Sequence, residues 1–182
     1  MTEYDILRNI FNERFLSKSQ KRLIEEKGSL KPQLVDIDET GRTKMSWTLY
    51  KFEMDECNFL PFFSNQDGSP KGLCKFCDYI MLVESRTKTY VILIEMKRGK
   101  SGEAEKQLYA SEVFMNYIFS TADRLHTDFD SDSFDIDSII LRKVKLKQMH
   151  SPKTTTIMQK VDLTQNFITY NSTGIFPIAQ FL

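Results

Sequence analysis

The sequence lacks the features that mark secreted, membrane and nucleic-acid-coating proteins. Only 3 of its 182 residues are cysteines, an odd number that argues against a disulfide framework and suits a reducing compartment. No apolar run approaches the length of a membrane span, and no signal-peptide pattern opens the chain. Basic and acidic residues number 25 each, so overall charge gives no sign of nucleic-acid binding. We therefore expect a cytoplasmic protein that does not bind membranes.

Repeats, low-complexity segments and linkers are also missing, and the length fits one domain spanning residues 1–182. Cys74 and Cys77 form a single CxxC, with Cys57 as a third thiol. A structural zinc site normally needs four ligands. We therefore expect buried thiols, with a zinc-stabilised interaction protein as a minor alternative.

The most informative stretch is CDYIMLVESRTKTYVILIEMKRG, residues 77–99. Its two apolar runs, Tyr79–Val83 and Tyr90–Ile94, are rich in β-branched and aromatic residues and flank a short polar segment, which predicts a β-hairpin. A turn centred between Arg86 and Thr87 places Asp78 directly opposite Glu95. The two carboxylates would then stand on one face of the sheet.

Facing side chains in an antiparallel pair have Cβ atoms about 4.5–5.5 Å apart, so two carboxylates there repel unless a cation lies between them. Mg²⁺ or Mn²⁺ suits such oxygen ligands. Lys97 shares the face of Glu95, where its ammonium could hold a water or offset phosphate charge, whereas Met96 points into the core. The alternative is solvated charges at strand ends, with Glu95 paired to Lys97 or Arg98.

Asp78 followed by Glu95-Met96-Lys97 resembles the D…(D/E)xK signature of the PD-(D/E)XK nuclease superfamily, specifically its small uncharacterised or defence-associated members. The resemblance implies a restriction-endonuclease-like α/β (α+β) fold. It also implies that Asp78, Glu95 and the backbone carbonyl of Met96 bind the metal. Lys97 would assist the attack of water on a phosphodiester.

The same resemblance suggests further site residues. Family members often add an acidic residue from a preceding helix. The candidates here are Glu13, Glu25 and Glu26, with Glu53 as a fourth if its strand borders the hairpin, and the sequence does not choose among them. Gln107 corresponds to the glutamine of the family's QxxxY pattern, although Ser111 stands in place of the tyrosine. We assign Gln107 a catalytic role in orienting the water or the substrate.

The remaining elements follow from periodicity and from turn residues. We predict a helix over Thr2–Lys27, strands over Leu34–Asp38 and Lys44–Glu53, a long helix capped by Ser101, an acidic loop over His126–Asp137, and strands over Ile139–Gln148, Phe167–Tyr170 and Ile175–Leu182. The long helix buries the stripe Ala104, Leu108, Ser111, Met115, Ile118, Ala122 and Leu125. The order predicts a mixed sheet flanked by an N-terminal helix and a long helix, which agrees with the restriction-endonuclease-like fold.

Basic residues gather after the hairpin and on the strand after the long helix. They are Arg98, Lys100, Arg142, Lys143, Lys145 and Lys147. Clustered positive charge in a neutral chain favours contact with a phosphate backbone. Edge-strand lysines that discourage aggregation are the alternative.

We expect a metal-dependent endonuclease that hydrolyses phosphodiester bonds with Mg²⁺ or Mn²⁺, on DNA rather than RNA. The alternative is a catalytically silent nuclease-fold module that binds nucleic acid or a partner protein. Substrate specificity, a homodimeric state and the need for a partner stay open at this point.

Overall fold

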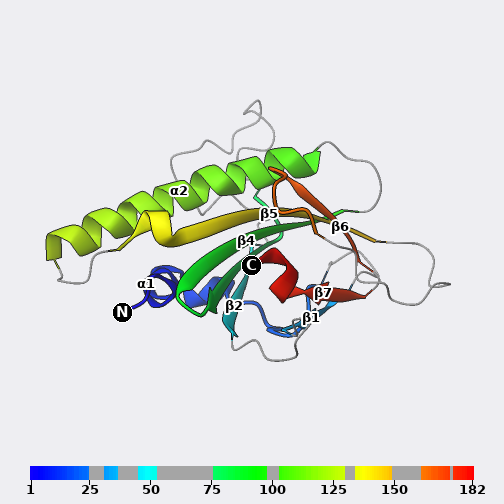
Figure 1. Ribbon diagram of the computed structural model, residues 1–182, viewed down its shortest axis with the longest axis horizontal. Coiled ribbons are helices and arrows are strands. Elements are labelled where there is room, and N and C mark those ends of the chain that lie inside the picture. The colour runs from blue at the N-terminus through cyan, green and yellow to red at the C-terminus, as the bar shows by residue number, and fades with distance from the viewer. Residues whose placement is uncertain are drawn as a thin grey trace.

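The computed structural model describes residues 1–24, 31–36, 45–52, 76–97, 103–129, 134–148, 161–172 and 174–182. Its main feature is a five-stranded sheet in the order β2-β3-β4-β5-β6 (Figure 1). The strands are β2 (Met45–Lys51), β3 (Tyr79–Ser85), β4 (Lys88–Lys97), β5 (Ile139–Gln148) and β6 (Ile168–Ser172). In a second small sheet, β1 (Gln33–Val35) pairs in parallel with β7 (Ile175–Pro177).

The connections confirm the predicted mixed sheet. β2, β3 and β4 form an antiparallel meander. The long helix α2 (Glu103–Phe129) then crosses over, so that β5 lies parallel to β4, and β6 lies parallel to β5. Helix α1 (Glu3–Ile10) precedes the meander. Among the described residues, no helix is long and apolar enough to cross a bilayer.

The two faces of the sheet are covered by different elements. Side chains of α1 and α2 pack with one set of strand residues, including Ile80, Leu82, Val91 and Leu93. The alternate residues, including Tyr79, Met81, Ile92 and Ile94, pack with residues of β1, β7 and the C-terminal 3-10 turn Ile178–Phe181. Successive strand residues point to opposite faces, and both faces here are buried. This is why β3 and β4 appear in the sequence as continuous apolar runs.

The hairpin has the register that the sequence predicts. Tyr79 pairs with Ile94 and Ser85 pairs with Lys88, which leaves Arg86 and Thr87 as the two turn residues. Arg86 has φ 57°, in the left-handed region that two-residue hairpin turns use. The turn therefore fixes which residues of β4 share a face with Asp78.

The predicted N-terminal helix is too long. A capping box at Thr2 starts α1 as expected, but Phe11 takes an extended conformation and the helix ends at Ile10. The Asn12 side chain then accepts a hydrogen bond from the Arg14 amide, which begins the 3-10 turn Glu13–Phe15.

Beyond that turn the chain follows β2 rather than a helical path. Leu16 forms a bridge with Tyr50, and the Ser17 amide donates to the Leu49 carbonyl over 2.9 Å. Helix periodicity up to Lys27 was therefore misleading, because pairing with a distant strand overrides local propensity.

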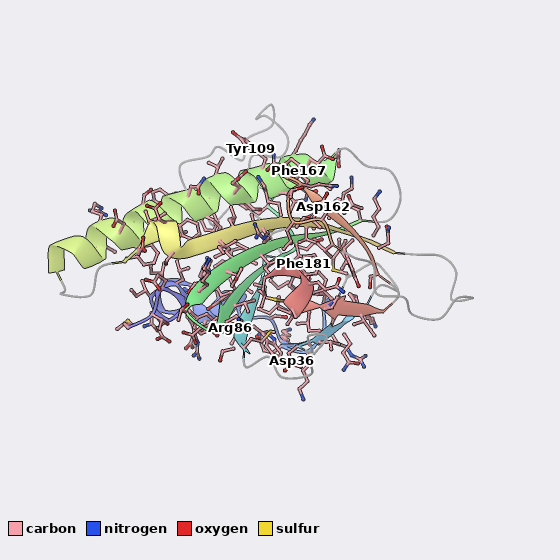
Figure 2. The ribbon with its side chains drawn as sticks, viewed as in Figure 1. Asp36, Arg86, Tyr109, Asp162, Phe167 and Phe181 are labelled. Carbon is pink, nitrogen blue, oxygen red and sulfur yellow. The ribbon has the colours of Figure 1, made fainter. Side chains whose placement is uncertain are left out.

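Helix α2 confirms most of the predicted buried stripe. Ala104, Leu108, Ser111, Met115 and Ala122 are fully buried and Ile118 is half-buried. Leu125, however, is 43% exposed, whereas Phe119, which is not part of the predicted stripe, is buried. Figure 2 shows Tyr109 on the outer side of α2. The predicted acidic loop is wrong at its start, because α2 continues to Phe129, and at its end, where Ile136–Ser138 is a 3-10 turn.

The other strands agree with the sequence to different degrees. β5 has the predicted bounds and β2 lies within its predicted range, whereas β1 is only 3 residues long. The last predicted strand ends at Pro177, after which the chain turns so that the Phe181 ring stacks on Phe176 at 4.6 Å. The predicted helix cap Ser101 and the thiols of Cys57 and Cys74 lie outside the described residues.

Arg86→Gly is expected to stabilise the protein. A left-handed conformation is strained for arginine but not for glycine. The strain energy that the substitution relieves exceeds the free-energy cost of glycine's greater entropy in the unfolded chain by about 0.5–1 kcal/mol. The measurement is urea unfolding, with Thr87→Gly as the control, because the neighbouring turn residue has no positive φ. A loss of stability in Arg86→Gly equal to that of the control would contradict the turn geometry.

Candidate functional site

Asp78 and Glu95 lie close together at the open end of the hairpin, and the carboxylate of each accepts a hydrogen bond from a backbone amide of the facing segment. The Asp78 amide donates to Glu95 Oε2 over 3.1 Å, and the Met96 amide donates to Asp78 Oδ2 over 2.7 Å. The Asp78 carbonyl in turn accepts from the Phe52 amide at the end of β2. The two carboxylates therefore converge, as the sequence predicts, and backbone hydrogen bonds from three strands fix their positions.

Glu95 is a buried carboxylate with one short ionic contact. The residue is 0% exposed, and its Oε1 lies 2.6 Å from Lys97 Nζ. The Lys97 ammonium is the partner of this oxygen among the described residues. Burial raises the pKa of Glu95 to about 7, the negative charge of Asp78 adds to the rise, and Lys97 opposes it. Glu95 is therefore a carboxylate whose charge needs a nearby cation.

Lys97 and Met96 follow Glu95 at the end of β4. Lys97 ends β4 on the same face as Glu95, with its side chain 24% exposed, so the ammonium reaches solvent beside a buried carboxylate. The N–H and C=O of one strand residue point to the same neighbouring strand. Since the Met96 amide bonds Asp78, the Met96 carbonyl also points to the Asp78 side.

The first turns of α2 brace the segment that leads into Asp78. Gln107 Nε2 donates to the Phe76 carbonyl over 3.3 Å. Ser111 Oγ accepts from the Cys77 amide over 2.7 Å and donates to the Gln107 carbonyl. Gln107 thus contacts the backbone two residues before Asp78. Ser111, which stands where the QxxxY pattern has tyrosine, links the Cys77 amide to the helix backbone.

Cys77 is buried, as expected for a structural thiol. Its side chain is 0% exposed and its Sγ donates to the Tyr79 carbonyl. Burial raises its pKa to about 12, so the thiol stays protonated at neutral pH. A protonated, enclosed thiol is neither a good metal ligand nor a good nucleophile.

The basic residues of β5 do not form one face. Lys143, Lys145 and Lys147 point toward α2, whereas Arg142 alternates to the opposite side. β5 lies between β4 and β6, and Lys145 and Lys147 pair with residues of both neighbours, so these two are not edge-strand lysines.

Two of these lysines are matched to acidic residues of α2. Lys143 is 7% exposed and donates to both carboxylate oxygens of Glu112, at 2.8 and 2.7 Å. Lys145 Nζ lies 4.0 Å from Glu105 Oε1. Lys143 therefore ties α2 to the sheet.

The sequence predicts Lys145 as a phosphate contact, but it does not predict that Lys145 lies beside Glu95. Lys145 pairs with Glu95 across the parallel β4–β5 ladder and is 9% exposed on the same face. Its period-two spacing was visible in the sequence, but the parallel register that places it beside Glu95 depends on the crossover of α2. Lys147 pairs in the same way with Lys97.

The third acidic residue is not found among the described candidates. Glu13 is exposed at the start of its 3-10 turn, and its charge acts on Tyr50 rather than on Glu95. Glu25, Glu26 and Glu53 lie outside the described residues, as do Arg98 and Lys100. Within the described part of the chain, no group of three or more histidine, cysteine, aspartate or glutamate residues is arranged to hold a metal.

The oxygen donors at this end of the sheet nevertheless suit a hard divalent ion. Two carboxylates and the carbonyl of Met96 are the ligand types that Mg²⁺ and Mn²⁺ prefer. The buried Glu95 Oε1, whose partner in the described structure is the Lys97 ammonium, supplies a charged oxygen whose desolvation such an ion would offset.

Comparison of the chain with protein-family models, with curated proteins and with solved structures finds no match.

Glu95→Gln is expected to change how stability depends on pH. The folded protein holds the Glu95 proton up to about pH 7, whereas the unfolded chain releases it near 4.5. Stability from this group is therefore lost as pH rises through that window, by about 3 kcal/mol relative to the glutamine variant. The measurement is urea unfolding from pH 4.5 to 8 in a chelating buffer.

The control for that experiment is Glu103→Gln, which changes an exposed glutamate in the first turn of α2. It should follow the wild type at every pH. If the free energy of unfolding changed with pH in the same way for the wild type and Glu95→Gln, Glu95 would not be protonated in the folded protein over this pH range.

Proposed function

We propose that this protein is a Mg²⁺- or Mn²⁺-dependent endonuclease that hydrolyses phosphodiester bonds, with DNA rather than RNA as its substrate. One observation carries the proposal. Asp78, Glu95 and Lys97 converge on one face at the open end of a single hairpin, with Glu95 Oε1 and Lys97 Nζ 2.6 Å apart. Carboxylates beside an amine are the groups that metal-assisted attack of water on a phosphate requires.

The order of the elements supports the same proposal. A helix, a three-stranded antiparallel meander, a crossover helix and a strand parallel to the end of the meander follow one another along the chain. This order agrees with the restriction-endonuclease-like core that the resemblance implies. Asp78 directly precedes the second strand of the meander and Glu95 lies near the end of the third, which supports the proposal.

Each residue has a distinct task in the proposed reaction. Asp78, Glu95 and the Met96 carbonyl would hold the ion, which supplies charge for the scissile phosphate and makes a water more acidic. The half-exposed Lys97 ammonium would orient the attacking water or stabilise charge on the phosphate. Gln107 would act indirectly, by holding the Phe76 carbonyl and thereby the start of β3.

Lys97→Ala is expected to abolish metal-dependent cleavage while the fold is kept. Loss of a group that positions water and stabilises charge costs about 10²- to 10⁴-fold in rate. Glu95 can accept a proton near neutral pH, so its burial does not require the lysine for folding. The measurement is cleavage of single- and double-stranded DNA and of RNA with Mn²⁺, alongside circular dichroism of each variant.

Lys88→Ala is the matched control, since it removes a lysine from the other end of β4. It should cleave at the wild-type rate. Unchanged cleavage by Lys97→Ala would contradict the assigned role, and a folded wild type that cleaves no nucleic acid under these conditions would contradict the proposal itself.

A catalytically silent module with this fold is the second candidate, and one observation favours it. The carboxylate oxygens at the site already accept hydrogen bonds from the Asp78 and Met96 amides or contact Lys97, and Glu95 is fully buried. A site closed in this way could serve to fix the hairpin alone. The two candidates differ in whether Asp78 and Glu95 take up a divalent ion at all.

A further inference from the structure

A second feature of the molecule is a cavity of about 420 Å³ beside the ends of β2 and β3. The segment that leaves the 3-10 turn Glu13–Phe15 forms one wall, and the facing wall comes from the two strands. The described lining residues are Arg14, Phe15, Leu16, Ser17, Lys18, Ser19, Ile24, Lys51 and Tyr79. The volume is well within the range of small-molecule sites and is large enough for a mononucleotide.

The described part of this lining carries three positive charges. Arg14, Lys18 and Lys51 are cationic, and the described lining residues include no aspartate or glutamate. In a chain with equal numbers of acidic and basic residues, three cations around one cavity are a local concentration of positive charge. Such a concavity attracts an anion, because low-dielectric walls focus the field.

Aromatic rings hold two of the cations in place. The Arg14 guanidinium carbon lies 4.5 Å from the centroid of the Phe15 ring, and that ring stacks at 4.9 Å on Phe52. Lys51 Nζ lies 5.9 Å from the centroid of the Tyr79 ring. Cation–π contacts of this kind restrict the side chains in advance, so less conformational entropy is lost when a ligand binds.

The rest of the lining suits an uncharged group of moderate polarity. Leu16 and Ile24 are apolar, and the Tyr79 hydroxyl bonds both the amide and the carbonyl of Ile24, at 2.8 and 2.9 Å, which fixes that wall. On the other side, Ser17 Oγ donates to the Ser19 carbonyl over 2.9 Å, which fixes that wall. The uncharged part of the lining therefore suits a sugar with a flat base.

We propose that this cavity binds a nucleoside phosphate, with Arg14, Lys18 and Lys51 holding the phosphate and the apolar wall receiving the nucleoside. The ligand could be a mononucleotide from solution or the phosphorylated end of a nucleic-acid strand, because the two present the same group. Arginine and lysine are the usual phosphate ligands of proteins, and the arginine can bind two phosphate oxygens at once.

The cavity is distinct from the carboxylate site but close to it. Lys51 pairs with Tyr79, which directly follows Asp78, and the Phe52 amide bonds the Asp78 carbonyl. Tyr79 nevertheless points to the opposite face of the sheet from Asp78. Binding at the cavity therefore needs neither the carboxylates nor a metal, so the inference goes beyond the proposed function and can fail or succeed without it.

Calorimetric titration in a chelating buffer tests the inference, because no cleavage interferes there. The probes are adenosine 5′-monophosphate, adenosine, inorganic phosphate, and a short oligonucleotide with and without a 5′-phosphate. We expect the nucleotide to bind about tenfold more tightly than either adenosine or phosphate alone, since only the nucleotide uses both parts of the lining. If the phosphorylated oligonucleotide binds more tightly than the mononucleotide, the ligand is the end of a nucleic-acid strand. If the mononucleotide binds more tightly, the ligand is the mononucleotide.

The variants Arg14→Gln and Lys51→Gln should each weaken nucleotide binding by about tenfold and leave the affinity for adenosine unchanged. Lys88→Gln, which removes a lysine at the start of β4 that does not line this cavity, is the matched control and should bind like the wild type. Equal affinity for the nucleotide and adenosine would overturn the inference. It would also be overturned if Lys88→Gln weakened binding as much as Lys51→Gln, because the effect would then come from overall charge.

Discussion

The reciprocal hydrogen bonds between Asp78 and the β4 backbone, and between Glu95 and the Asp78 amide, are the constraint on which the site depends. They exist only in one register of the hairpin. A slip of one residue would carry Glu95 and Lys97 to the other face of the sheet, where Ile92, Ile94 and Met96 now pack. The two-residue turn at Arg86 and the apolar alternation of both strands thus determine where the carboxylates lie.

Helix α2 closes the face that carries these carboxylates, and its attachment is partly electrostatic. Glu112 receives two hydrogen bonds from Lys143, while Ser111 and Gln107 hold the backbone just before Asp78. Burial is the largest cause of the rise in the pKa of Glu95 to about 7, and the charge of Asp78 adds to it. The site is therefore a buried carboxylate whose charge a divalent cation would stabilise.

The sequence predicts the parts of this arrangement that depend on local patterns. The hairpin, its register, β5 and most of the α2 stripe follow from periodicity and turn length, so the meeting of Asp78 with Glu95 was predictable. The path after Ile10 was not, because Leu16 and Ser17 pair with β2 instead of continuing the helix. The position of Lys145 beside Glu95 was not predictable for a similar reason, since only the parallel ladder places it there. Errors thus fall where contacts distant in sequence outweigh local propensity.

The central claim is that two carboxylates of neighbouring strands and the adjoining Met96 carbonyl form a cation site beside Lys97. Anomalous diffraction from crystals soaked in Mn²⁺ tests it most directly. The account predicts a peak within bonding distance of both Asp78 and Glu95, at about 2.0–2.2 Å from their oxygens, as for other small divalent ions. It also predicts that the peak disappears in Asp78→Asn. Fully soaked crystals with no peak between these two side chains would contradict it.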